Sequence, residues 1–147
     1  MCFELDSEPP IPVIRGAAVT HDDLTLTAAD GTDLAAFLAE PDGPARVGVV
    51  VLPDVRGLYH FYEELALRFA ERGMAAVAFD YFGRTAGVAK RDDDFPYMEH
   101  VQQTTPEGVQ HDVRAAVELM RSPRAGGCAA VFTVGFCFGG RNSWLAA

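Results

Sequence analysis

The apolar residues of this chain follow two patterns that take turns along the sequence. Residues 47–52, 74–79 and 129–134 are short, almost continuously apolar runs, as in strands that are buried on both faces. Between them, residues 58–72 and 106–120 place apolar side chains at helical spacing with polar residues on the opposite face. This alternation predicts an α/β fold, a mostly parallel sheet with flanking helices.

A β-hairpin is expected to precede these units. Residues 24–27 alternate between apolar and polar, Asp30 and Gly31 form a turn signal, and residues 34–39 are again apolar. Residues 1–22 are polar and contain several prolines, which favours an irregular lead-in along the surface.

The sequence also predicts the placement of several polar residues. Residues 86–104 are typical of a loop. Glu64 and Arg68 are expected on the solvent face of the first helix, paired at i, i+4. His111 and Asp112 are expected on the solvated face of the second helix.

Composition narrows the class of protein. The chain has 147 residues, of which 49% are hydrophobic, enough for the core of one domain spanning residues 1–147. Its formal net charge of −9 argues against nucleic acid or an anionic membrane as a partner. The first residues do not resemble a signal peptide and no apolar run is long enough to span a bilayer, so we expect a cytoplasmic protein.

The cysteines do not suggest a structural framework. Cys2, Cys128 and Cys137 are three in number and irregularly spaced, which predicts neither a disulfide scaffold nor a zinc site. We expect no cofactor and no metal centre. Cys128 lies at the start of the last apolar run and is expected to be a buried structural residue, whereas Cys2 belongs to the lead-in.

Cys137 stands in a different setting. Residues 135–140 are Gly-Phe-Cys-Phe-Gly-Gly and directly follow the last apolar run. Gly-x-Cys-x-Gly between a strand and a helix is the pattern of a nucleophile elbow, with sulfur in place of the usual serine oxygen. The glycines leave room for a tight turn, and the free N–H groups of the following helix favour a thiolate and a developing oxyanion. The pattern therefore predicts Cys137 as a catalytic nucleophile.

Taken together, these features resemble the dienelactone hydrolase family, a branch of the α/β-hydrolase fold. The resemblance rests on the Met-Cys-Phe opening, the hairpin, Pro-Asp-Val-Arg-Gly-Leu at residues 53–58, Asp-Tyr-Phe-Gly-Arg at residues 80–84 and the elbow itself. It covers essentially the whole chain. It implies cleavage of a small, possibly anionic ester or lactone through a cysteine nucleophile and a thioester intermediate.

The resemblance also assigns roles to single positions. It implies that the backbone N–H groups of Val55 and Phe138 form the oxyanion hole. Asp54 stands where family members commonly have a glutamate that contacts the resting thiol, although aspartate is one methylene shorter. Arg84 stands where the family has an arginine that grips a substrate carboxylate.

Each of these roles has a structural alternative. Asp54 has the chemistry of a helix cap, and Arg84 that of a loop anchor. Tyr81 is a candidate for lining the substrate pocket, while aromatic residues in such loops also serve simply to pack.

One part of the family pattern is missing. Family members place an acid and then a histidine after later strands, whereas His21, His60, His100 and His111 all precede the elbow. Of these, His60 is placed nearest to the active-site edge. We therefore expect the N-terminal part of a longer enzyme, lacking the C-terminal strands and inactive by itself, with an unpaired apolar sheet edge.

Two other functions stay open. One is a non-catalytic or degenerate α/β-hydrolase-like binding protein. The other is an amidotransferase-like enzyme, which also uses a cysteine elbow but lacks the opening hairpin. The sequence makes no prediction of the oligomeric state.

Overall fold

A five-stranded sheet forms the centre of the molecule. The structure is a computed structural model that describes residues 3–4 and 6–147. The spatial order of the strands is β1-β2-β4-β3-β5. Their bounds are Val19–Thr27 for β1, Asp33–Pro41 for β2, Val47–Leu52 for β3, Ala75–Phe79 for β4 and Ala130–Gly135 for β5.

The sheet combines a hairpin with a parallel unit. β1 pairs antiparallel with β2, and β2 pairs antiparallel with β4. β4, β3 and β5 then run parallel, with Val50 opposite both Val77 and Thr133. The expected α/β architecture, with a hairpin before the parallel strands, is confirmed.

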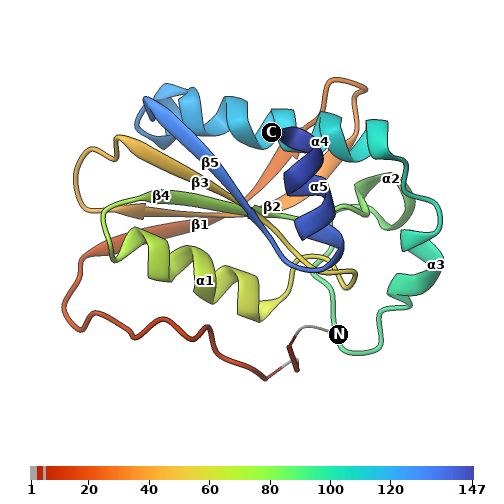
Figure 1. Cartoon of the computed structure of the whole chain (residues 1–147), viewed down its shortest axis with the longest axis horizontal. Coiled ribbons are helices and arrows are strands. Elements are labelled where there is room, and N and C mark those ends of the chain that lie inside the picture. The colour runs from red at the N-terminus through yellow and green to blue at the C-terminus, as the bar shows by residue number, and fades with distance from the viewer. Residues whose placement is uncertain (1–2, 5) are drawn as a thin grey trace.

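Helices cover both faces of this sheet, as Figure 1 shows. α1 (His60–Ala70) lies on one face, and α4 (Pro106–Arg121) lies on the other. Thr105 caps α4 by accepting a hydrogen bond from the Gly108 amide at 3.1 Å, with Pro106 in the first turn. Two buried apolar clusters result, one on each face of the sheet.

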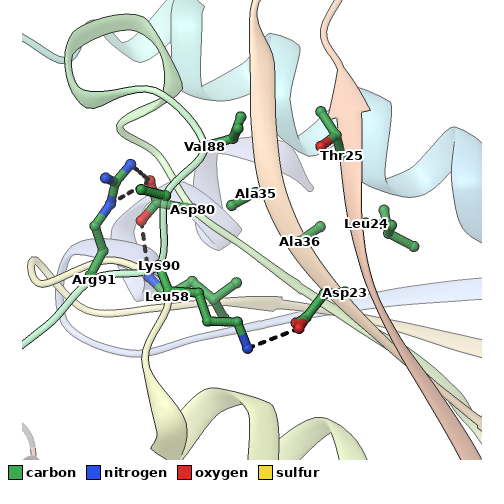
Figure 2. Close-up of a pocket in the computed structure, with 11 residues that line it drawn as sticks. Asp23, Leu24, Thr25, Ala35, Ala36, Leu58, Asp80, Val88, Lys90 and Arg91 are labelled. Atoms are coloured by element: carbon green, nitrogen blue, oxygen red, sulfur yellow. Dashed lines mark hydrogen bonds and ion pairs between the residues drawn. The ribbon is translucent and has the colours of Figure 1, made fainter.

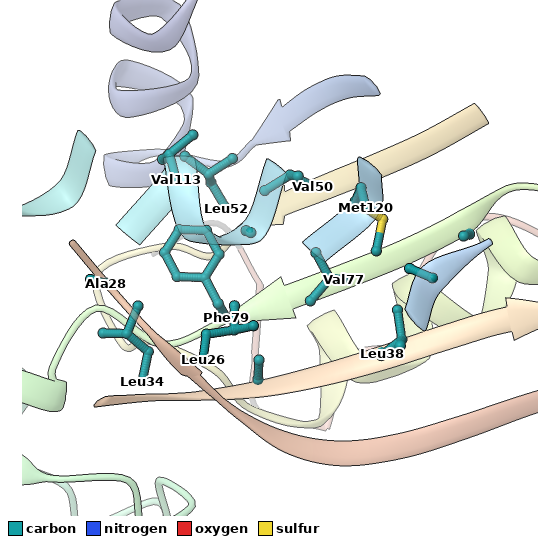
Figure 3. Close-up of a cluster of buried hydrophobic side chains, with 14 of the residues drawn as sticks. Leu26, Ala28, Leu34, Leu38, Val50, Leu52, Val77, Phe79, Val113 and Met120 are labelled. Carbon is teal, nitrogen blue, oxygen red and sulfur yellow. The ribbon is translucent and has the colours of Figure 1, made fainter. Parts of the chain in front are cut away.

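The larger cluster fills the space between the sheet and α4 (Figure 3). Leu38, Val50 and Val77 contribute from the strands, and Val113 and Met120 contribute from the helix. These residues are the apolar positions of the strand and helix patterns in the sequence. The apolar face of α4 therefore packs directly on the apolar side chains of the sheet.

Four details of the sequence prediction are wrong. β1 begins at Val19, inside the expected lead-in, and the expected loop of residues 86–104 contains the helix α3 (Tyr97–Val101), with α2 (Gly83–Ala86) just before it. Such short helices are held by tertiary contacts and leave little periodic signal. Arg68 is buried, because Glu64 and Glu71 both pair with its guanidinium. The i, i+4 pair with Glu64 was expected, but not its burial.

Asp112 is the fourth correction. It is fully buried instead of solvated, because the Arg84 guanidinium reaches it from α2. The 3-10 helix η1 (Pro123–Ala125) follows α4, and α5 (Phe138–Ala146) follows β5. Among residues 3–4 and 6–147, no helix has both the length and the apolar character that crossing a bilayer requires.

Candidate active site

The turn between β5 and α5 has the geometry of a nucleophile elbow. Cys137 stands at the N-terminus of α5 with φ 52° and ψ −111°, and it is the one non-glycine residue with positive φ in the described chain. Its side chain is exposed. A residue held in this unfavourable region at a strand-to-helix turn presents its side chain above the sheet. The predicted turn is therefore present, while the catalytic role of the thiol stays a prediction.

The flanking glycines are required by close backbone contacts. A Cβ on Gly135 would collide with the carbonyl of Gly139, and a Cβ on Gly139 would collide with the carbonyls of Leu52 and Pro53. Gly140 has more room, because a Cβ added there would lie 3.2 Å from its nearest neighbour, the Gly135 carbonyl oxygen. The elbow thus packs directly on the end of β3, which brings the loop after β3 beside Cys137.

That loop carries one of the two predicted oxyanion donors. Val55 follows β3 by three residues, and Phe138 follows Cys137 directly. Neither backbone N–H donates a hydrogen bond within the part of the chain that the structure describes. Both N–H groups are thus left without an acceptor in the described chain, as an oxyanion hole requires, while their role as its donors stays a prediction.

Tyr81 connects the two sides of this candidate hole. It is buried, and its hydroxyl donates a hydrogen bond of 2.9 Å to the Pro53 carbonyl. Its ring meets the Phe138 ring edge-on, with centroids 5.1 Å apart. Burial raises the pKa of the Tyr81 hydroxyl well above its usual value, so this group stays a neutral donor. Its predicted contact with substrate is not tested by these interactions.

Asp54 is fully buried beside the elbow, but its hydrogen bonds are made elsewhere. Its carboxylate accepts from the Arg56 backbone N–H at 2.9 Å and from the Arg56 guanidinium at 2.9 Å. The Tyr59 hydroxyl donates to it at 3.3 Å, and the Asp54 N–H donates to the Tyr62 hydroxyl at 2.9 Å. The Cys137 thiol is not among these partners, so activation of the thiol by Asp54 stays a prediction.

Asp54 and Arg56 form a buried ion pair. Burial alone would lower the pKa of the Arg56 guanidinium, but its hydrogen bond to Asp54, the Asp54 charge and the neighbouring tyrosines together outweigh burial and raise that pKa. Burial also raises the pKa of the Tyr59 and Tyr62 hydroxyls, and the Asp54 charge adds to the effect. The tyrosines therefore remain protonated next to the carboxylate.

The lead-in reaches this network. The Phe3 ring stacks on Phe61 with centroids 3.9 Å apart and meets Phe136 edge-on at 5.5 Å. Its carbonyl also accepts a hydrogen bond from the Arg56 guanidinium. Phe136 directly precedes Cys137, so Phe3 contacts both sides of the candidate site.

Arg84 is already engaged on two sides. Its guanidinium contacts Asp112 at 2.8 Å and Asp30 in the hairpin turn at 2.8 Å. The hydrogen bond with Asp112 raises the pKa of Arg84, and the hydrogen bond with Arg84 lowers the pKa of Asp30 to about 2. Burial, in contrast, raises the pKa of Asp112. A substrate carboxylate would have to displace one of these two acids from Arg84.

A second buried charge pair was missed by the sequence analysis. Arg91, from the loop before α3, contacts Asp80 at 2.9 Å, and both side chains are almost fully buried. Asp80 also accepts from the backbone N–H groups of Leu58 and Phe82 at 3.0 and 2.8 Å. Asp80 therefore ties together the loops after β3 and β4. Only Asp80 itself could have been noticed, as a polar residue at the end of a buried strand.

Two cavities lie on either side of Arg91. The cavity in Figure 2 has a volume of about 170 Å³ and is lined by β1, β2 and the loop of residues 88–91, with Lys90 paired to Asp23 across it. The other has a volume of about 180 Å³ and is lined by Arg56 and Tyr59, the two partners of the Asp54 carboxylate, together with Phe95. The second cavity is thus connected to the candidate site through Asp54.

Each of the four histidines contacts a residue other than Cys137. His21 stacks on Phe37 in the hairpin, and His60 lies 3.6 Å from Glu8. His100 hydrogen-bonds to Thr85 at 2.8 Å, and His111 lies 4.0 Å from Glu107 on α4. Among the described residues, then, no imidazole is hydrogen-bonded to Cys137.

The other predictions concern cysteines and metals. Cys128 is buried and its thiol contacts the Ala125 carbonyl, as expected for a structural residue. Cys2 lies outside the described residues. Within the described ranges, no group of three or more histidine, cysteine and acidic side chains is arranged to hold a metal ion.

Comparison with known proteins places this geometry in a family. The family model of the dienelactone hydrolases matches residues 34–147. A carboxymethylenebutenolidase from Rhodococcus opacus is 28% identical over 159 residues, which cover 100% of this chain and 54% of the relative. The match thus includes the hairpin, both loops and the elbow.

Solved structures agree with this assignment. A dienelactone hydrolase-like promiscuous phosphotriesterase from metagenomic libraries superposes with a TM-score of 0.75 at 26% identity, covering 90% of this chain and 54% of that one. A cold-adapted esterase from an Arctic intertidal metagenomic library has a TM-score of 0.63 at 21% identity, covering 95% of this chain and 59% of its own, and shows the fold alone. The chain spans about half the length of the relatives that it matches. On the strength of the family match and the elbow that it contains, the chain belongs to the dienelactone hydrolase family.

Proposed function

We propose that this chain carries the nucleophile and the oxyanion hole of a hydrolase for small esters or lactones. The observation that carries the proposal is the conformation of Cys137: an exposed thiol at positive φ, at the N-terminus of α5, beside two unused backbone N–H groups. A buried structural cysteine, such as Cys128, needs none of these features.

The first chemical step follows from this arrangement. The Cys137 thiolate attacks the carbonyl carbon, and the C–O double bond opens to an oxyanion held by the Val55 and Phe138 N–H groups. The carbonyl then re-forms as the bond to the leaving oxygen breaks, which gives a thioester and an alkoxide that takes a proton from water. With a phenolic leaving group this step needs no acid from the protein.

Hydrolysis of the thioester is the step for which the described residues provide no catalytic base. It needs a base to activate water, and the histidines of this chain are placed elsewhere. We therefore propose that the chain alone becomes acylated quickly and is deacylated slowly. This behaviour also separates a hydrolase-type site from a binding protein, which would not become acylated.

A burst experiment tests the proposal. The chain is mixed with excess p-nitrophenyl acetate, and we expect close to one equivalent of nitrophenolate followed by a much slower rate. Mass spectrometry should then find the acetyl group on the peptide that contains Cys137. Cys137→Ala should abolish the burst, and Cys128→Ala, the matched control, should preserve it. A burst that survives Cys137→Ala, or an intact chain without any adduct, would refute the proposal.

The charge of the substrate can be tested at Arg84. Asp112 is buried, but Asp30 is exposed to 36%, so Asp30 is the partner that a substrate carboxylate could replace. If Arg84 grips an anionic substrate, Asp30→Asn should speed acylation by a carboxylate-bearing phenyl ester and leave the neutral ester unchanged. Equal effects on the two esters would remove Arg84 from the substrate site.

A further inference from the structure

The loop after β3, residues 53–58, pairs all of its backbone N–H groups except one. Pro53 has no N–H, and the acceptors of the paired groups are the Tyr62 hydroxyl for Asp54, the Asp54 carboxylate for Arg56, the Asp54 carbonyl for Gly57 and the Asp80 carboxylate for Leu58. Within this loop, only the Val55 N–H has no acceptor among the described residues. The loop thus offers a single N–H group to an atom outside it.

The direction of that N–H group is set by Asp54. The Asp54 carbonyl and the Val55 N–H belong to the same planar peptide group and point in opposite directions. The carbonyl accepts the Gly57 N–H at 3.2 Å, so the Val55 N–H is directed away from that bond. The Asp54 carboxylate accepts the Arg56 N–H at 2.9 Å, in a side-chain turn that aspartate and asparagine favour. Both hydrogen bonds are accepted by Asp54 and enclose Val55, so they hold its peptide group in place.

The Asp54 carboxylate has no acceptor position to spare. One oxygen accepts from the Arg56 backbone N–H at 2.9 Å and from the Arg56 Nε at 3.3 Å. The other accepts from the Arg56 guanidinium at 2.9 Å and from the Tyr59 hydroxyl at 3.3 Å. A carboxylate has about four acceptor positions, and Asp54 is fully buried. The Cys137 thiol could therefore hydrogen-bond to it only by displacing one of these donors.

We propose that Asp54 is a positioning residue that orients the Val55 N–H toward the oxyanion, while Arg56 and Tyr59 hold its carboxylate in place. The inference rests on the proposed hydrolase function, and it differs from the thiol contact that the family resemblance implies. The role depends on the length of the side chain more than on its charge, because the carboxylate must accept from a backbone N–H two residues along the chain.

Two substitutions separate side-chain length from charge. Asp54→Glu keeps the charge that pairs with Arg56 but is one methylene too long for the turn. Asp54→Asn keeps the length and an acceptor oxygen but removes the charge. In the burst experiment, Asp54→Glu should slow acylation by about tenfold and Asp54→Asn by less than about threefold, whereas complete loss of an oxyanion donor costs roughly 100- to 1,000-fold. Activation of the thiol by the Asp54 charge predicts the reverse order.

A reaction without an oxyanion provides the control. Alkylation of Cys137 by iodoacetamide, followed as a function of pH, should have the same profile in Asp54→Glu and in the wild type. Asp42→Glu makes the same substitution at an exposed residue after β2 and should alter neither reaction. Circular dichroism checks that each variant is folded. If Asp54→Asn does not fold because Arg56 loses its buried partner, Asp54→Glu, which keeps the ion pair, still decides.

Amide hydrogen exchange tests the turn without any acylation. In the wild type the Val55 amide should exchange quickly and the Arg56 amide slowly, and Asp54→Glu, unlike Asp54→Asn, should speed exchange at Arg56. A wild type that is never acylated but has this exchange pattern would refute the proposed function and still support Asp54 as the residue that orients the Val55 N–H. Unchanged acylation and exchange in Asp54→Glu, or slower acylation in Asp54→Asn than in Asp54→Glu, would overturn the positioning role.

Discussion

Removing the hydroxyl of Tyr81 tests the proposed oxyanion hole. This hydroxyl holds the Pro53 carbonyl at 2.9 Å, two residues before Val55. The same carbonyl lies against Gly139, where a Cβ would collide with it. Tyr81→Phe keeps the ring contact with Phe138 and removes only the hydrogen bond. The variant therefore changes how firmly the Val55 N–H is aimed, without changing the thiol.

The size of the effect can be bounded. Complete loss of an oxyanion donor costs roughly 100- to 1,000-fold in rate. Loosening a donor by removing one supporting hydrogen bond should cost about 0.5–1.5 kcal/mol, or roughly 2- to 12-fold. The buried Pro53 carbonyl loses its partner, so the free energy of unfolding should also fall by about 1–3 kcal/mol.

Two reactions of the same sulfur separate the oxyanion hole from the nucleophile. Acylation by p-nitrophenyl acetate passes through an oxyanion, whereas alkylation by iodoacetamide does not. We expect Tyr81→Phe to slow acylation and to leave alkylation of Cys137 unchanged. Ser122→Ala, which removes a hydroxyl that donates to the Leu119 carbonyl at 2.7 Å near the end of α4, is the control and should alter neither rate. Equal slowing of both reactions, or of neither, would refute the role of Tyr81, while a wild type that is never acylated would refute the proposed function itself.

Three further variants probe the frame of the site. Gly139→Ala should destabilise the fold by about 3 kcal/mol in urea titrations, because its Cβ meets two carbonyls, whereas Gly140→Ala should cost less than about 1 kcal/mol. Arg84→Gln leaves the buried Asp112 without its ion partner and should lower the free energy of unfolding by about 3 kcal/mol. Arg114→Gln, on the exposed face of α4, is the control and should cause no measurable change. Similar losses in the two variants would contradict the pairing of Arg84 with Asp112. Asp30→Asn should cost about 0.5–1 kcal/mol at neutral pH after allowance for solvent exposure. Arg84 lowers the pKa of Asp30 from 3.8 to about 2, so this contribution is present above pH 3.8 and is lost as the pH falls towards 2; a pH-independent difference would argue against it.

Local patterns predicted the parts of the fold that local physics determines. The buried strands, the two long helices and the cap at Thr105 follow from periodicity and from capping chemistry, and all are present. The elbow was predicted because only glycine fits beside such close backbone contacts, and Gly135 and Gly139 show this directly.

Long-range pairing was not predictable from the same patterns. Asp112 occupies a polar position beside His111, and its burial depends on Arg84, 28 residues away in the sequence. Arg91 and Asp80 likewise meet only through the path of the loop before α3. A charged residue in a helix or loop is normally solvated, and nothing local distinguishes one whose partner arrives from another element.

The stacking of Phe3 on Phe61 and Phe136 has a practical consequence for handling the protein. The ring of Phe3 contacts Phe136, the neighbour of Cys137, and the Phe3 carbonyl accepts a hydrogen bond from the Arg56 side chain that pairs with Asp54. A purification tag fused ahead of it, or trimming by an aminopeptidase, would disturb the surroundings of a thiol more than 130 positions downstream. Comparisons of reactivity are therefore best made on chains with identical, untagged beginnings.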